Sequence, residues 1–185
     1  MTTVFVSGSR KVSRINDLIR DRIKNIVDQG FQIVVGDASG ADKALQKFLD
    51  DIRYSNVLVF CSGASCRNNV GNWEVRKIDV PSNVKGREFY TQKDKAMAKE
   101  ADFGFVLWDG KSAGSVSNVF ELLRQGKKSV VYRSPEKRFI NIGSVQDAKH
   151  LLSSCDTESY ELISKKIRLP TLLSELENAN QGSFF

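Results

Sequence analysis

Three short segments of this 185-residue chain combine glycine with serine, aspartate or arginine, and they offer the clearest chemistry in the sequence. Each follows a strand-like apolar run and leads into a stretch with helical periodicity. The first N–H groups of a helix lack intrahelical acceptors and carry the positive end of its dipole, and glycine lets the backbone approach a ligand closely. The pattern therefore predicts that the segments bind a phosphate or another anion. The segments are Ser7-Gly8-Ser9-Arg10, Gly36-Asp37-Ala38-Ser39-Gly40-Ala41-Asp42 and Asp109-Gly110-Lys111-Ser112-Ala113-Gly114-Ser115.

The elements that must position these segments alternate between strands and helices. The apolar periodicity predicts strands over 2–7, 31–35, 56–60, 103–107 and 128–132, with a further short strand over 139–142. Helices are predicted between them, followed by helices over about 144–154 and 157–178. This order is typical of parallel strands with right-handed crossovers. We therefore expect an α/β, three-layer Rossmann-like fold with a mainly parallel sheet of at least five strands and helices on both faces.

The composition indicates one cytoplasmic domain. Hydrophobic residues make up 41% and charged residues 27% of the chain, and no apolar run is long enough for a membrane span. No secretory signal is recognisable. We expect a single domain over 1–178 with an irregular arm over 61–87, and a C-terminal tail over 179–185. The net charge of +6 favours anionic partners, but Lys and Arg are spread along the chain, so nucleic acid is not the favoured partner.

Several kinds of site are excluded or disfavoured because the sequence lacks the motifs that they require. No G-x-G-x-x-G follows the first strand and no P-loop motif is present, which argues against an NAD-dependent dehydrogenase and an NTPase. The single histidine, His150, falls in a C-terminal helix, which argues against a Ser-His or Cys-His pair. Cys61, Cys66 and Cys155 have no zinc-binding spacing, and we expect reduced thiols. We predict no metal and no cofactor.

Two of the glycine segments resemble a known superfamily. Gly36-x-Ala38-x-Gly40-x-Asp42 is similar to the G-x-A-x-G-x-D stretch of DNA-processing protein A, and Asp109-Gly110 to Gly114-Ser115 resembles the G-G-x-G-T turn of the Lonely Guy phosphoribohydrolases. Both belong to the SLOG superfamily of Rossmann-like nucleotide-binding proteins. The Gly-Ser-Arg turn after the first strand resembles that of small single-domain bacterial SLOG proteins. The likeness covers roughly residues 2–132 as an order of elements.

The resemblance implies a ligand and a set of binding residues. We expect a nucleotide or nucleotide-derived ligand at the carboxyl ends of the parallel strands. Arg10 is expected to contact phosphate with its guanidinium, and Asp42 either complements a helix dipole or contacts a ligand hydroxyl. The predicted ligand-binding or phosphate-binding residues are Ser7, Gly8, Ser9, Arg10, Gly36, Asp37, Gly40, Asp42, Gly110, Gly114, Ser115 and Asn118.

The resemblance leaves open whether the domain is an enzyme. In the Lonely Guy enzymes a Glu follows the G-T pair three residues later and serves glycosidic cleavage, whereas this chain has Asn118 there. Asn cannot act as a carboxylate base or nucleophile. If the chain hydrolyses an N-glycosidic bond, Asp109 is the first candidate for the catalytic carboxylate and Glu121 the second.

Three functions are therefore compatible with the sequence. The first is nucleotide binding with N-glycosidic hydrolysis, and the second is a non-catalytic module that senses a nucleotide-derived signal. The third is binding of single-stranded DNA, as in DNA-processing protein A. A homodimer is one way of completing such a pocket, and the apolar faces of the helix over 115–125 are compatible with one.

Overall fold

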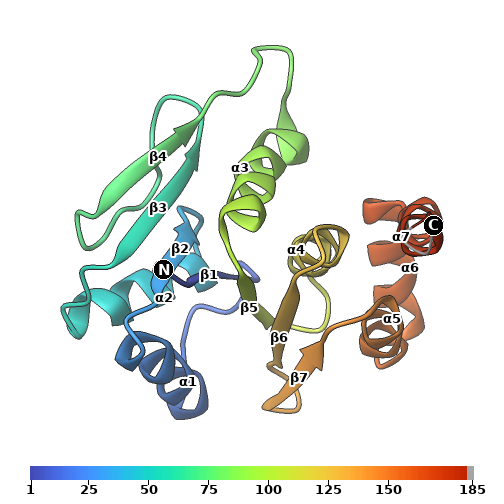
Figure 1. The fold of residues 1–185 in the computed structure, drawn as a ribbon, viewed down its shortest axis with the longest axis horizontal. Coiled ribbons are helices and arrows are strands. Elements are labelled where there is room, and N and C mark those ends of the chain that lie inside the picture. The colour runs from blue at the N-terminus through green and yellow to red at the C-terminus, as the bar shows by residue number, and fades with distance from the viewer. Residues whose placement is uncertain (183–185) are drawn as a thin grey trace.

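One seven-stranded sheet organises the chain. The computed structural model describes the backbone of residues 1–182 and the side chains of residues 1–179. The sheet order is β4-β3-β2-β1-β5-β6-β7, and every neighbouring pair is parallel except β6 and β7 (Figure 1). The strands are β1 (Thr3–Gly8), β2 (Gln32–Gly36), β3 (Val57–Ser62), β4 (Glu74–Ile78), β5 (Phe103–Trp108), β6 (Lys128–Arg133) and β7 (Arg138–Ile142).

Helices cover both faces of the sheet, so the three-layer Rossmann-like α/β fold is confirmed. The first two helices pack on one face, and the next two pack on the other (Figure 1). The central strands are buried on both faces, which explains their continuous apolar sequences. The helices are α1 (Asp17–Asp28), α2 (Ala41–Asp51), α3 (Gly86–Glu100), α4 (Ala113–Arg124), α5 (Val145–Ser153), α6 (Thr157–Ile167) and α7 (Leu169–Gly182).

The segment over 61–87, expected to be irregular, contributes the edge strand β4. Its sequence, Glu-Val-Arg-Lys-Ile, is mostly charged and its side chains are exposed or half-buried, so it lacks the apolar signal of the buried strands. Charged residues on an edge strand protect it from pairing with other chains. The preceding loop turns back along α2, where the Val70 N–H donates to the side-chain oxygen of Gln46 at 2.9 Å.

The strand order reverses at β1. The chain runs from β1 to β2 and β3 on one side, and after α3 it returns to β5 on the other side of β1. In open α/β sheets this reversal opens a crevice at the carboxyl ends of the strands, because the two loops leave in opposite directions. The three glycine segments follow β1, β2 and β5, the three strands that meet at this point.

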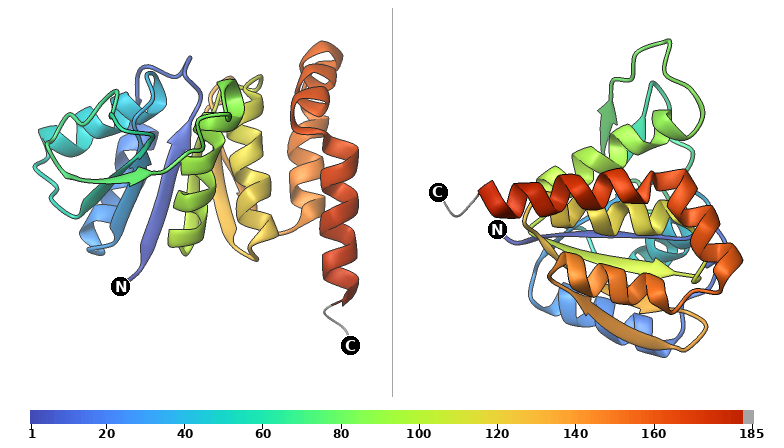
Figure 2. Two further views of the ribbon diagram at one scale, coloured as in Figure 1. Left: turned by 90° about the horizontal axis from the view of Figure 1, so that it is seen from above. Right: turned by 90° about the vertical axis from the view of Figure 1, so that its right-hand side faces the viewer.

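The C-terminal helices lie beyond the β7 edge. Figures 1 and 2 show α5, α6 and α7 stacked at this end of the molecule, and α6 packs on α4. The helix α7 continues to Gly182, so the first residues of the expected tail are helical, and residues 183–185 lie outside the described part of the chain. Within the described part, no helix is long and apolar enough to cross a membrane.

Candidate functional site

Ser9 joins the three glycine segments. Its backbone N–H donates to the carbonyl of Leu107 at 2.8 Å, and its carbonyl accepts from the N–H of Ala41 at 3.1 Å. Its hydroxyl donates to Oδ2 of Asp109 at 2.8 Å. The ends of β1 and β5 and the start of α2 therefore lie together, as the sequence predicts for the carboxyl edge of a parallel sheet.

Glycine is required where these segments touch. Gly40 has a φ of 79°, in the left-handed region, and a Cβ there would overlap the backbone of Arg10. A Cβ at Gly8 would overlap the carbonyl of Leu107 and the side chain of Ala41. The loops can pack this closely only because these side chains are missing.

A cavity of about 350 Å³ opens at this junction. It is lined by several of the predicted residues and by residues of α3 and of the loop after β3, which were not among the predicted site residues. Five predicted residues are not part of the lining: Ser9, Gly36, Asp37, Gly40 and Gly110. Ser9 and Gly40 hold the loops together, and Gly36 packs closely against the Asp42 side chain. The predicted residues in the lining are Ser7, Gly8, Arg10, Asp42, Gly114, Ser115 and Asn118.

The first turn of α4 forms one end of the cavity. The Ser112 side chain caps the helix by accepting from the N–H of Ser115, whereas the N–H groups of Ala113 and Gly114 have no acceptor among the described residues. The Ser115 hydroxyl is buried and also without a partner. Asn118, one turn later, donates to the Ser7 hydroxyl at 3.2 Å. This end offers several free donors at the positive end of a helix, an arrangement suited to an anion.

A buried charge cluster forms another part of the lining. Asp42 on α2 is 5% exposed and Lys93 on α3 is 4% exposed. Oδ2 of Asp42 accepts from the N–H of Ala38 at 3.2 Å, and the ammonium of Lys93 donates to Asp94 at 2.7 Å. Burial raises the pKa of Asp42 to about 6, against the opposing effect of the Lys93 charge. Burial works against the charged form of Lys93, but the carboxylates of Asp94 and Asp42 raise its pKa above the usual value.

Arg67 and Asp37 form a second ion pair at the rim. Asp37 accepts from the backbone N–H of Arg67 and from its guanidinium on both oxygens, at 2.5–3.1 Å. Burial alone would raise the pKa of Asp37, but these hydrogen bonds and the Arg67 charge bring it below the usual value. Arg67 stacks over the Tyr90 ring at 4.3 Å, and Arg10 lies over the same ring at 5.7 Å. Asp37 thus orients a cavity-lining arginine and does not itself line the cavity.

The two carboxylates predicted to be catalytic lie outside the cavity lining. Oδ1 of Asp109 accepts from the N–H groups of Lys111 and Ser112, and Oδ2 accepts from Ser9. Asp109 therefore shapes the turn before α4. Glu121, two turns into α4, pairs with Arg124 through both oxygens and also accepts from Gln125. The carboxylates that line the cavity, within the described residues, are Asp42 and Asp94.

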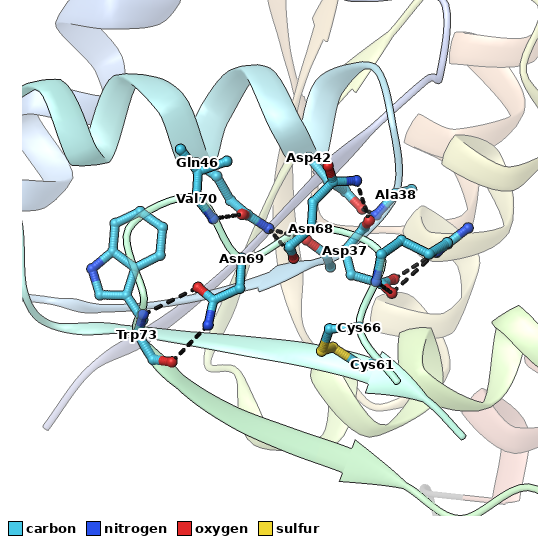
Figure 3. Close-up of a disulfide and its surroundings, with 12 residues drawn as sticks. Asp37, Ala38, Asp42, Gln46, Cys61, Cys66, Asn68, Asn69, Val70 and Trp73 are labelled. Atoms are coloured by element: carbon cyan, nitrogen blue, oxygen red, sulfur yellow. Dashed lines mark hydrogen bonds and ion pairs between the residues drawn. A yellow bond between two sulfur atoms is a disulfide. The ribbon is translucent and has the colours of Figure 1, made fainter. Parts of the chain in front are cut away.

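A disulfide between Cys61 and Cys66 corrects the expectation of three reduced thiols (Figure 3). It joins the end of β3 to the residue before Arg67. The two sulfurs and an Asp37 oxygen lie within 4.8 Å of one another, a grouping that could hold a metal ion. In this structure the sulfurs are bonded to each other and Arg67 occupies both Asp37 oxygens, so these groups have no ligand atoms left for a metal. Cys155 is a free thiol, and burial raises its pKa.

One of the cavity-lining residues that we did not predict, Lys93, has a recognisable signal in the sequence. Lys93 falls four residues after Phe89 and four before Met97, on the apolar stripe of the predicted helix over 88–100. A lysine at such a position must be paired or face a cavity, because a lone buried ammonium is costly. Arg67 lies in a loop rich in hydrogen-bonding side chains, a composition that is equally typical of a lid over a ligand and of a solvated loop.

A larger hollow of about 560 Å³ lies at the opposite, amino ends of the strands. It is lined mainly by apolar side chains, among them Phe31, Phe103 and Phe105. None of the three glycine segments reaches it, although Gly143 and Asp147 at the start of α5 are part of its lining. The smaller cavity is therefore the candidate functional site. No protein-family model and no curated protein matches this chain, so the site is interpreted from its own residues.

Proposed function

We propose that the chain binds a nucleotide or another phosphorylated nucleotide-derived ligand in the cavity, with a phosphate at the start of α4. The observation that carries the proposal is the buried, unpartnered hydroxyl of Ser115 beside the free N–H groups of Ala113 and Gly114. Buried polar groups are nearly always hydrogen-bonded, so the Ser115 hydroxyl is suited to bond to a molecule in the cavity. Arg10 adds a positive charge to the same lining.

The cavity is also the right size for such a ligand. Pockets for small molecules and cofactors usually measure about 300–1,000 Å³, and this one measures about 350 Å³. A polynucleotide would need an open groove that follows its backbone. These features favour a single small ligand over single-stranded DNA. They also fit the resemblance of the glycine segments to the SLOG superfamily, which we retain as part of the proposal.

Between hydrolysis and simple binding, the side-chain contacts favour binding. Asp109 and Glu121 already have hydrogen-bond partners outside the cavity, and Asn118 cannot serve as a base. A glycosidic cleavage would therefore depend on Asp42 or Asp94. Incubation with adenosine monophosphate or NAD, followed by chromatography for free base, separates the two functions.

Isothermal titration with nucleotides tests the proposal. Arg10→Ala should weaken binding roughly tenfold to a hundredfold, the usual effect of losing a hydrogen bond to a charged group. Arg14→Ala is the matched control, because Arg14 is exposed and lies outside the cavity lining. Equal losses in both variants, or no binding of any nucleotide at millimolar concentration, would contradict the proposal.

A further inference from the structure

A second ligand contact, which rests on the proposed function, involves the part of the cavity lined by Asp42 and Lys93. Asp42 and Lys93 come from different helices and meet beside Gly36 (Figure 3 shows Asp42 at the start of α2). A Cβ built on Gly36 would overlap Oδ2 of Asp42 and would lie 2.6 Å from the ammonium nitrogen of Lys93. The absence of a side chain at this position lets the two charged groups approach the end of β2.

Both groups have hydrogen-bonding capacity that the described residues do not use. Oδ1 of Asp42 has no donor in the described part of the chain, although the residue is 95% buried and lines the cavity. The Lys93 ammonium carries three N–H donors, and only the one directed at Asp94 has a partner. One free acceptor and free donors therefore face the same space.

The charge of this cluster excludes some ligands. Asp42 and Asp94 place two carboxylates beside the Lys93 ammonium, so this part of the lining is less suited to a second phosphate than the parts that carry arginines. A metal ion is disfavoured because the ammonium of Lys93 lies on the Asp94 oxygen that would coordinate it. A neutral group that both donates and accepts fits best, and a hydroxyl is such a group.

The sheet sets the distance between this cluster and the phosphate end. Asp42 and Lys93 lie at the end of β2, and α4 follows β5, with β1 between them. Two strand spacings amount to about 10 Å. A separation of this order can be bridged by a phosphate and the sugar to which it is esterified.

We propose that Asp42 and Lys93 bind hydroxyl groups of a sugar whose phosphate lies at the start of α4, which makes the ligand a phosphorylated sugar or its nucleoside. A sugar hydroxyl donates to Oδ1 of Asp42, and a hydroxyl oxygen accepts from the Lys93 ammonium. The base of a nucleoside would then extend toward Tyr90, whose ring is already covered by Arg67 and Arg10. Affinity should therefore depend on the sugar phosphate more than on the base.

Titration of the wild-type chain with methyl phosphate and with ribose 5-phosphate tests this inference. The two esters share the phosphate group, and only the second has hydroxyls. Ribose 5-phosphate should bind at least about tenfold more tightly, because its hydroxyls bond to charged groups. Asp42→Asn and Lys93→Met should each lose most of that advantage, taken as the ratio of the two affinities within one variant, and binding of methyl phosphate by a variant shows that it is folded.

The possible results separate the two proposals. If methyl phosphate binds and ribose 5-phosphate binds no more tightly, the sugar site is wrong and the phosphate site stands. If the advantage persists in both variants, hydroxyl recognition by Asp42 and Lys93 is wrong. If neither ester binds, the phosphate site fails and the sugar site fails with it. If one variant does not fold, the comparison on the wild-type chain still tests hydroxyl recognition and the other variant tests the assigned residues.

Discussion

The side-chain amide of Asn118 donates a 3.2 Å hydrogen bond to the hydroxyl of Ser7, which ties the first turns of α4 to the end of β1. Both residues line the cavity. The Asn118 amide therefore holds the end of β1 against the start of α4, where we place the phosphate. A carboxylate at this position could only accept from the Ser7 hydroxyl, and it would add a negative charge.

The first prediction follows from that contact. Asn118→Asp should lower phosphate affinity by at least about tenfold, because a like charge a few ångströms from the ligand is repulsive in a buried site. Asn118→Ala removes the same hydrogen bond without adding charge and should cost less. Calorimetric titration with adenosine monophosphate checks that Asn118→Asp binds more weakly than Asn118→Ala. Equal affinities of the two variants would contradict the prediction.

The second prediction concerns the pH dependence of stability. Because burial raises the pKa of Asp42 from 3.8 to about 6, the native state binds this proton more tightly than the unfolded state. The stabilising contribution is fully present below pH 3.8 and is lost as the pH rises through about 6. Relative to the wild-type chain, Asp42→Asn should therefore gain up to about 3 kcal/mol of stability between pH 4 and pH 7.

Urea unfolding of both chains at a series of pH values measures this difference. The comparison isolates Asp42, because Asp37, whose pKa is lowered, is present in both proteins. A stability difference that stays constant between pH 4 and pH 7 would show that Asp42 titrates normally. A difference of the opposite sign would show that it is stabilised as the anion.

The third prediction contrasts two glycines. Gly114→Ala places its Cβ in ordinary contact with the Ser112 hydroxyl, 3.8 Å away, so the fold should be retained and α4 should not be destabilised. The new methyl group faces the phosphate end, so affinity should fall. Gly36→Ala should reduce both stability and affinity, because its Cβ overlaps the Asp42–Lys93 cluster. Thermal unfolding and titration of the two variants check the contrast, and a stable Gly36→Ala variant with normal affinity would contradict it.

The fourth prediction concerns the disulfide. After unfolding in iodoacetamide, the unreduced protein should take up one label, at Cys155, and the reduced protein three. Reduction should lower the stability by about 2 kcal/mol, as expected for closing a loop this short. Ligand affinity should change little, because hydrogen bonds from Asn68 to Asp37 and from Val70 to Gln46 also hold this loop. Three labels without reduction would disprove the bond.

The fold could be predicted because its signals are local. The apolar runs of β1, β2, β3, β5 and β6 and the glycines after them follow one another in a regular alternation, and parallel strands place their carboxyl ends at one edge. β4 was missed because an exposed edge strand needs no apolar run. The arm that we expected to be irregular therefore contains a strand whose pairing depends on β3 alone.

The site was predicted only in part, because local signals place only some of its residues. Residues next to the strand ends, such as Ser7 and Ser115, could be placed from topology. Arg67 and Lys93 could not, because Arg67 lies in the loop that leads to the edge strand β4 and Lys93 lies in the helix that returns from it. Asp109 was chosen for its place at a strand end, but a carboxylate there also caps the following turn, and sequence alone does not distinguish the two roles.

Amide proton–nitrogen correlation spectra during titration with adenosine monophosphate would test the phosphate site most directly. We predict that the largest shifts fall on the N–H groups of residues 113–115 at the start of α4, with smaller shifts at residues 8–10, and that adenosine without its phosphate leaves residues 113–115 unshifted. Shifts confined to other parts of the sheet, or identical shifts with adenosine, would contradict the assignment of the phosphate to α4.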